Sequence, residues 1–187
     1  NEKHPSFNNL IHQDFLLANL KACFPSKSLV VVGNFPYNIS SQILFKCLAH
    51  RTEITGIVGM FQKEVAQRIC EKPGSRQYGI LSVLMQAFYE VEYGFTIKPG
   101  AFNPPPKVDS AVIHCKRKAK FHLDCDEDLF FRVVKMAFNQ RRKILRNSLK
   151  SLMEEKDLPE ALAMSRPEQL DVEAFVLLTT IIERANE

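Results

Sequence analysis

Four consecutive residues, Asn34-Phe35-Pro36-Tyr37, combine groups that could hold the amine of a nucleobase. They directly follow residues 28–33, an apolar run that predicts a strand. Ligands of doubly wound sheets bind at the carboxyl ends of strands, so we expect a ligand site here. The Asn34 side-chain oxygen and the Phe35 backbone carbonyl are two acceptors for the two N–H groups of an adenine amine. Pro36 would stiffen the turn, and Tyr37 would stack on an extruded base.

This arrangement suits methyl transfer to nitrogen. The exocyclic amine of adenine is a poor nucleophile because its lone pair is delocalised into the ring. Two acceptors would favour the tetrahedral nitrogen that forms as a methyl group arrives. Such chemistry needs positioning and local electrostatics, and it needs neither a metal nor a covalent intermediate. A strand-end turn of this composition is also compatible with a purely structural role.

The segments around the tetrad predict a parallel crossover. A second apolar run, residues 54–61, predicts another strand, and both runs look buried on both faces, as in a parallel sheet. The segment between them has apolar residues at helical spacing, with Ser40 or Ser41 available as N-cap. The apolar positions are Ile43, Leu44, Cys47 and Leu48.

The rest of the first 118 residues continues this α/β pattern. Residues 63–71 and 78–88 predict helices, and residues 91–97 and 108–116 predict strands. The connector 98–107 between those strands is too rich in proline for regular structure.

The pattern changes near Ala119, beyond which no strand is predicted. Apolar stripes at helical spacing follow, and Asp171 can cap a last helix. The stripes are Phe130, Val133, Val134, Ala137 and Phe138, then Ile144, Leu145, Leu149 and Leu152, then Phe175, Leu178 and Ile182. We therefore expect an α/β domain over residues 1–118 and a small all-helical domain over residues 119–187.

Charge is distributed unevenly along the chain. The net charge is +4, but residues 116–150 carry 11 basic and 4 acidic groups, net +7, whereas residues 151–187 are net −6. A local basic segment beside an acidic tail indicates a polyanionic partner for one region, or only a solvated helix face. The densest basic motif is Gln140-Arg141-Arg142-Lys143 with Arg146, expected to cover much of the circumference of one helix.

Composition excludes several classes of protein. No apolar run approaches the roughly 20 residues of a membrane helix. The five cysteines are odd in number and lack Cys-x-x-Cys spacing, and the histidines have no ligand spacing, so we expect scattered core cysteines, no metal and a reducing compartment.

Segments along nearly the whole chain together resemble one family. They are Gly33-Asn-Phe-Pro-Tyr-Asn-Ile-Ser40, Phe61-Gln-Lys-Glu-Val65, Tyr78-Gly-Ile-Leu-Ser-Val83, Ala101-Phe-Asn-Pro-Pro-Pro-Lys-Val-Asp-Ser-Ala-Val112 and Ala137-Phe-Asn-Gln-Arg-Arg-Lys-Ile-Leu-Arg-Asn-Ser-Leu149. The chain resembles the small-subunit rRNA adenine N6,N6-dimethyltransferases, which methylate two adjacent adenines near the 3′ end of that RNA. The resemblance implies a Rossmann-like sheet that uses S-adenosyl-L-methionine (SAM) as methyl donor.

The resemblance also implies roles for single residues. Asp14 matches the acidic residue that lies against the adenine of SAM, although a loop aspartate is the plainer interpretation. Asn34 matches a residue that touches both cofactor and target amine. Phe102 matches an aromatic residue packed on the flipped base, although a core phenylalanine is the plainer interpretation. Its place in the proline-rich connector favours an exposed, functional ring.

The basic residues are expected to contact RNA phosphates, which fix position without reading bases. The candidates are Lys107, Arg141, Arg142, Lys143 and Arg146. We favour Arg142 and Lys143. One or two of the other arginines are equally suited to salt bridges with the sheet domain, and Lys107 could simply be solvated.

The start of the sequence departs from the family pattern. A SAM-binding Rossmann domain opens with a strand, a Gly-rich turn and an acidic residue after the second strand. This chain has no such Gly-x-Gly, and residues 9–15 correspond to the third strand. We therefore expect a fragment with an unpaired sheet edge that lacks the N-terminal SAM-binding motif, binds SAM weakly and is catalytically silent alone.

The expected partner is small-subunit rRNA within an immature ribosomal subunit, bound by a monomer in the cytoplasm, away from membranes. Three alternatives stay open: a large-subunit rRNA adenine dimethylase, a non-catalytic ribosome-assembly or RNA-binding factor, and a mitochondrial transcription-factor relative on the same scaffold. The runs Pro-Pro-Pro-Lys-Val-Asp-Ser and Phe-Asn-Gln-Arg-Arg-Lys favour the small-subunit group.

Overall fold

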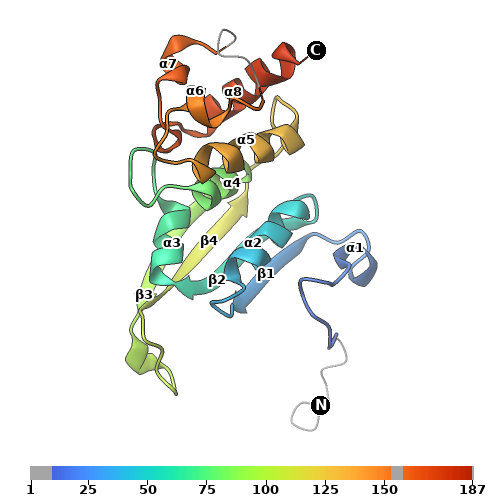
Figure 1. Ribbon diagram of the computed structural model, residues 1–187. Coiled ribbons are helices and arrows are strands. Elements are labelled where there is room, and N and C mark those ends of the chain that lie inside the picture. The colour runs from blue at the N-terminus through green and yellow to red at the C-terminus, as the bar shows by residue number, and fades with distance from the viewer. Residues whose placement is uncertain (1–9, 153–157, 187) are drawn as a thin grey trace.

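The computed structural model describes residues 10–152 and 158–186 (Figure 1). Within them, a four-stranded mixed sheet has the strand order β1-β2-β4-β3. The strands are β1 (Leu29–Asn34), β2 (Ile54–Gln62), β3 (Tyr89–Ile97) and β4 (Ser110–Arg117). β1 runs parallel to β2, and β4 runs antiparallel to both of its neighbours. The predicted parallel crossover is confirmed.

Helices pack on one face of this sheet. They include α2 (Ser40–Ala49), the crossover between β1 and β2, as well as α3 (Lys63–Cys70) and α4 (Ile80–Phe88), which follow β2. The expected apolar stripe of α2 is confirmed, because Leu44, Cys47 and Leu48 are fully buried. Neither serine caps α2 as expected: Ile39 occupies the N-cap, and the Ser40 hydroxyl donates to the Tyr37 carbonyl instead.

The opposite face of β1 is open in the described part of the chain. Residues of β1 alternate between half-buried and exposed, and Val30 and Val32 are 60% and 71% exposed. The expectation that β1 is buried on both faces is therefore wrong for the described residues. The physical reason is that α2, α3 and α4 all lie on the other side of the sheet (Figure 1).

Residues 10–15 form no strand, so the strand expected over 9–15 is also wrong there; residue 9 lies outside the described part. A turn over residues 15–17 follows, and then the short helix α1 (Leu20–Cys23) leads into β1. An isolated extended segment has no neighbour to receive its backbone hydrogen bonds, which accounts for the turn.

The remainder of the described chain, after β4, is helical. Its longest helices are α5 (Glu127–Asn139) and α8 (Val172–Ala185), which pack on each other and on α4. Between them lie α6 (Leu145–Ser148), α7 (Glu160–Ala163) and the 3₁₀ helix η3 (Pro167–Gln169). Only α6 forms where an apolar stripe over 144–152 predicted a longer helix.

The cap of the last helix agrees with the sequence. The Asp171 carboxylate accepts from the Ala174 N–H at 2.8 Å, as predicted for the last helix. The buried side of α8 contains Phe175, Leu178 and Ile182. Among the described residues, no helix has the length and apolar character needed to cross a membrane.

Candidate active site

The tetrad and the proline-rich connector enclose a cleft of about 430 Å³. The connector lies between β3 and β4 and contains the 3₁₀ turn η1 (Pro99–Ala101). The residues that line the cleft are Asn34, Phe35, Pro36, Tyr37, Phe102, Pro104, Pro105 and Pro106. The structure thus brings Phe102 to the tetrad across 65 or more residues of sequence, as the interpretation of both motifs required. Phe102 is half-buried, and its ring is available from the cleft.

Phe35 is positioned by two glycines. Its side chain is 8% exposed and meets the Phe61 ring edge-on at 5.2 Å between centroids. A Cβ atom at Gly59 would approach the Phe35 ring to 2.3 Å, and one at Gly33 would approach it to 2.7 Å. The ring therefore belongs to the core, and only the backbone of Phe35 is available to a ligand.

Asn34 has the opposite arrangement. It is the last residue of β1, and its side chain is exposed. Within the described chain, neither its amide nor the Phe35 carbonyl has a recorded hydrogen-bond partner, whereas the Phe35 N–H donates to the Met60 carbonyl at 3.3 Å. The two acceptors proposed for an amine are thus free at the mouth of the cleft.

Tyr37 is held by a hydroxyl that the sequence motif did not single out. Its phenol oxygen lies 2.6 Å from the Ser110 Oγ, and Ser110 is fully buried at the start of β4. This bond fixes the ring of Tyr37 between the turn after β1 and the end of the connector. The signal was available, because Ser110 closes the Pro-Pro-Pro-Lys-Val-Asp-Ser run.

Asp109, also missed, closes the connector at its base. Its carboxylate accepts from the Lys98 ammonium at 2.8 Å and from the Lys63 ammonium at 3.4 Å. These two cations, Lys98 foremost, hold the pKa of Asp109 below its ordinary value. Since Lys98 directly follows β3 and Asp109 directly precedes β4, the pair joins the two ends of the loop that carries Phe102.

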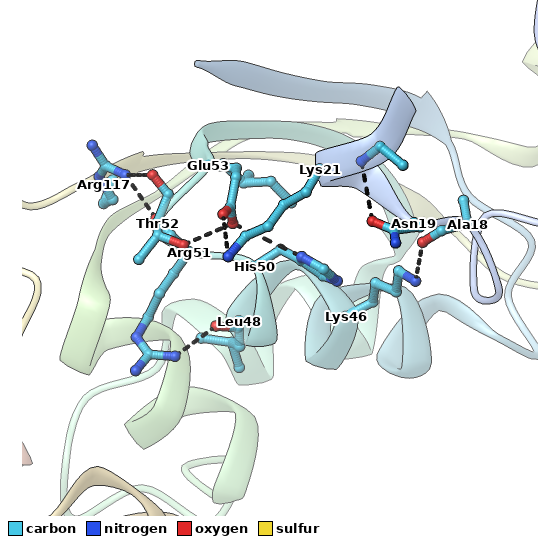
Figure 2. Close-up of polar contacts among 12 residues, drawn as sticks. Ala18, Asn19, Lys21, Lys46, Leu48, His50, Arg51, Thr52, Glu53 and Arg117 are labelled. Atoms are coloured by element: carbon cyan, nitrogen blue, oxygen red, sulfur yellow. Dashed lines mark hydrogen bonds and ion pairs between the residues drawn. The ribbon is translucent and has the colours of Figure 1, made fainter. Parts of the chain in front are cut away.

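Asp14 lies in a turn that is fastened to α2. The Lys46 ammonium donates to the Leu16 carbonyl at 2.9 Å and to the Ala18 carbonyl at 2.6 Å. Figure 2 shows the Lys46 contact with Ala18 beside the Asn19 cap of α1. Lys46 therefore joins the segment that follows Asp14 to the helix that follows the tetrad.

The same figure shows how the far end of this segment is held. Lys21 of α1 pairs with Glu53 at 3.1 Å, next to His50 at the end of α2 (Figure 2). Arg117 donates to the carbonyls of Arg51 and Thr52 in the same turn. Fastened at both ends, residues 16–21 have a defined place beside α2.

Asp14 itself is exposed and is not among the residues that line the cleft. One carboxylate oxygen accepts from the Leu16 N–H at 2.8 Å, which leaves the other free to bind an amine. For SAM, Asp14 thus offers an acceptor to the adenine amine, and Asn34 offers a free amide to the methyl-bearing end. They supply no cradle for its carboxylate or ribose.

Residues 140–143 of the basic motif are not helical, contrary to expectation, although Arg146 lies in α6. α5 ends at Asn139, and residues 140–143 form a turn closed by a bond from the Lys143 N–H to the Gln140 carbonyl at 2.7 Å. The helix ends there because the chain turns to place Leu145 against the Ser165 carbonyl, at 2.9 Å. Arg142 and Lys143 project from this turn, exposed and without a recorded partner among the described residues.

Arg141 and Arg146 have structural partners. Arg141 donates to the Ser75 carbonyl at 3.0 Å and lies 3.8 Å from Glu168, so it links the helical domain to the loop after α3. Arg146 pairs with Glu160 at 2.8 Å. Lys107 is exposed at the end of the connector. The five basic candidates therefore do not form a single surface at the cleft.

Comparisons with known proteins agree with this fold. A dimethyladenosine transferase from Plasmodium falciparum superposes with a TM-score of 0.79 at 24% identity, over 94% of this chain and 72% of that one. The 23S rRNA methyltransferase ErmE superposes with a TM-score of 0.61 at 25% identity, over 95% of this chain and 71% of that one. The fold of this chain is therefore that of the Rossmann-like methyltransferases.

Sequence comparison narrows the class to a family. The family model described as ribosomal RNA adenine dimethylase matches residues 3–183. The protein named ribosomal RNA small subunit methyltransferase A of Flavobacterium johnsoniae is 55% identical over 175 residues, 93% of this chain and 67% of that protein. The chain belongs to the ribosomal RNA adenine dimethylase family, and it spans about two thirds of that relative's length.

Proposed function

We propose that this chain carries the target-binding half of an enzyme that transfers two methyl groups from SAM to N6 of each of two adjacent adenines of small-subunit rRNA. The observation that carries the proposal is the cleft in which Asn34, Tyr37 and Phe102 meet. Kinship with a small-subunit methyltransferase at 55% identity supports the small subunit over the large one.

The chain's own residues would bind and orient the base. Tyr37, fixed by Ser110, and Phe102 would contact the extruded adenine, which leaves the stack for the reaction. The Asn34 oxygen and the Phe35 carbonyl would accept from the two N–H groups and aim the nitrogen lone pair at the methyl donor. As the new C–N bond forms and the methyl–sulfur bond breaks, the nitrogen becomes tetrahedral and positively charged, and the acceptors stabilise that charge until the proton passes to solvent. In the second transfer, one N–H remains for them to hold.

SAM would supply an electrophilic methyl group on a sulfonium. Within this chain, Asp14 would hold the adenine of the donor and Asn34 would contact its reactive end. Lys46 would act as a positioning residue, because its two bonds to carbonyls fix the turn that follows Asp14. The polypeptide has seven glycines and no Gly-x-Gly before the tetrad, so we propose that it binds SAM weakly and transfers no methyl group when alone.

The helical domain, residues 119–187, would dock the enzyme on folded RNA. Arg142 and Lys143 are exposed and unengaged among the described residues, which suits contact with phosphates. Lys107 would meet phosphate near the cleft, and Arg141 and Arg146 would support the surface from beneath. We propose that the enzyme acts as a monomer on an immature subunit in the cytoplasm. Burial raises the pKa of the Cys47 and Cys115 thiols to about 12, so both stay protonated and unreactive in the core.

The test is methyl transfer to small ribosomal subunits that lack these methyl groups. In the full-length protein, Asn34→Ala should bind the subunit normally but lose at least about 100-fold in transfer rate, as when a preorganised acceptor is removed. The matched control is Asn38→Ala, an exposed asparagine that does not line the cleft. Transfer at the wild-type rate by Asn34→Ala would refute the role of Asn34.

A non-catalytic assembly factor is the second candidate, because the exposed Arg142 and Lys143 would suit contact with RNA with or without methyl transfer. It predicts that the full-length wild-type protein binds the subunit and incorporates no labelled methyl group. A mitochondrial transcription-factor relative predicts binding to duplex DNA in preference to the subunit.

A further inference from the structure

A second hollow, apart from the cleft, lies where the sheet domain meets the helical domain. Its volume is about 340 Å³, within the range of pockets that hold small ligands. We name it the arginine pocket after the residues that the argument uses: Phe45, Arg68, Arg76, Gln77, Phe138 and Arg141. They come from α2, from α3 and the loop after it, and from the end of α5.

The pocket is electropositive. Three guanidinium groups line it, and the Lys135 ammonium lies 5.4 Å from the centroid of the Phe45 ring. Two carboxylates compensate part of this charge: Glu64 pairs with Arg68 at 3.0 Å on an exposed surface, and Glu168 lies 3.8 Å from Arg141. Arg76 has no recorded partner among the described residues and is exposed. A cation without a carboxylate is available to an anion from solution.

The loop that presents Arg76 is held from both sides. The Gly74 N–H donates to the Glu168 carbonyl at 2.6 Å, and Arg141 donates to the Ser75 carbonyl at 3.0 Å. Gly74 has φ +92°, a conformation that glycine adopts without strain. Arg76 and Gln77 thus project from a backbone that is already fixed, which lowers the entropy lost when they bind a ligand.

The pocket also lies between the two surfaces assigned above. Ser41, four residues after Tyr37, lines one side, and Arg141, adjacent to exposed Arg142, lines the other. An RNA strand that enters the cleft and reaches the basic turn would pass this hollow. The half-buried ring of Phe45, in a hollow that three guanidinium groups also line, is a surface on which an unpaired base stacks. Phe138 is buried against Phe175 and forms part of the wall.

We propose that the arginine pocket binds one unpaired nucleotide of the RNA substrate, its phosphate on Arg76 and its base against Phe45. The inference rests on the proposed function, and it adds a second point of grip on the substrate beside the target adenine. An accessible aromatic ring, Phe45, together with guanidinium groups favours a nucleotide over an acidic peptide, which would need only the charges. Arg141 acts as a positioning residue, because its bond to Ser75 holds the loop.

The experiment uses the full-length protein and small ribosomal subunits that lack the methyl groups. Arg76→Ala should weaken binding about 5- to 10-fold and lower the slope of log affinity against log salt by about 1. Phe45→Leu should weaken binding about fivefold or more, since stacking on a ring contributes to each bound base. Arg132→Ala is the matched control, an exposed arginine on α5 outside the pocket, and should change binding less than about twofold. Unfolding midpoints would confirm that each variant is folded.

A photoreactive benzoyl-phenylalanine placed at Gln77 identifies what occupies the pocket. A crosslink to RNA supports the inference, and a crosslink to a ribosomal protein overturns it. Binding by Arg76→Ala and Phe45→Leu within twofold of wild type overturns it as well, even where Asn34→Ala shows that the proposed function stands. Conversely, a wild-type protein that transfers no methyl group but binds RNA through Arg76 would refute the proposed function and leave the pocket assigned.

Discussion

Asn34 and Phe35 are neighbours in sequence, but one side chain is exposed and the other is buried. The exposed amide is available to a ligand, and the buried ring holds the backbone beside it. The Asn34 side chain is exposed at the end of β1, whereas the Phe35 ring is buried against Phe61. The buried ring fixes the backbone of the turn, so the Phe35 carbonyl is held in place without side-chain bonds. Preorganised acceptors of this kind stabilise developing charge without reorganisation during the reaction.

The bond between Tyr37 and Ser110 can be tested by a double-mutant cycle. Tyr37→Phe and Ser110→Ala in the full-length protein should each lower the methyl-transfer rate about 3- to 10-fold, because either change frees the ring that we propose contacts the base. The double variant should be no worse than the poorer single variant, since both remove one interaction. If the fold-losses of the two single variants multiply in the double variant, the two residues act independently.

Gly59 should tolerate no side chain. A Cβ there would lie 2.3 Å from the Phe35 ring and 2.6 Å from the Phe61 ring, so we expect Gly59→Ala to lower the free energy of unfolding by about 1–3 kcal/mol. Gly56→Ala is the control in the same strand, because its nearest neighbour would be at 3.5 Å. Urea denaturation measures both. Equal midpoints for the two variants would contradict the packing argument.

At the scale of elements, the connector between β3 and β4 depends on one carboxylate. Asp109→Asn should lower the methyl-transfer rate of the full-length protein about 3- to 10-fold, because the loop that carries Phe102 loses its bonds to Lys98 and Lys63. Asp124→Asn, which removes an exposed pair with Lys120, should leave the rate unchanged. A rate equally reduced in both variants would exclude a specific role for Asp109.

The same carboxylate predicts a dependence on pH. The pKa of Asp109 is lowered in the folded protein, so the stabilisation it contributes is complete above the ordinary aspartate pKa. This stabilisation is lost as the pH falls below about 4 and passes through the lowered pKa of Asp109. NMR shifts of the amides of residues 98–109 should therefore stay constant from neutral pH to about 5 and change only in stronger acid. Asp109→Asn should abolish that change.

The elements themselves were predictable to different degrees. α2, α5 and α8 follow from apolar residues at helical spacing, since one face of each meets the core. The cleft also follows from its two motifs. The open face of β1 could not be predicted, because an apolar run does not reveal which neighbours cover it. The turn over 140–143 was missed because Arg141 and Leu145 bond to segments remote in sequence, Ser75 and Ser165.

At the scale of the whole molecule, the two candidate surfaces come from different elements. The cleft belongs to the sheet, whereas the exposed Arg142 and Lys143 belong to the turn after α5. The domains are joined where Arg51, beside the Phe88 ring, pairs with Glu127 of α5. Desolvation of Arg51 lowers its pKa, but an arginine stays charged at any working pH. Under the proposed function, this joint would help to hold the cleft and the basic turn at a fixed separation.

The last prediction concerns the binding of SAM to the 187-residue polypeptide by itself. Asp14 and Asn34 offer two contacts to SAM, while the sequence before the tetrad has no Gly-x-Gly to cradle its carboxyl end. We expect calorimetry to give a dissociation constant weaker than about 100 µM for SAM and this polypeptide. Each loss of about 1.4 kcal/mol in binding free energy weakens the affinity tenfold, and most of the contacts with SAM are missing. The full-length protein serves as control and should bind in the low micromolar range. Low micromolar binding by the 187 residues alone would mean that Asp14 and the open face of β1, near Val30 and Val32, already form a donor site.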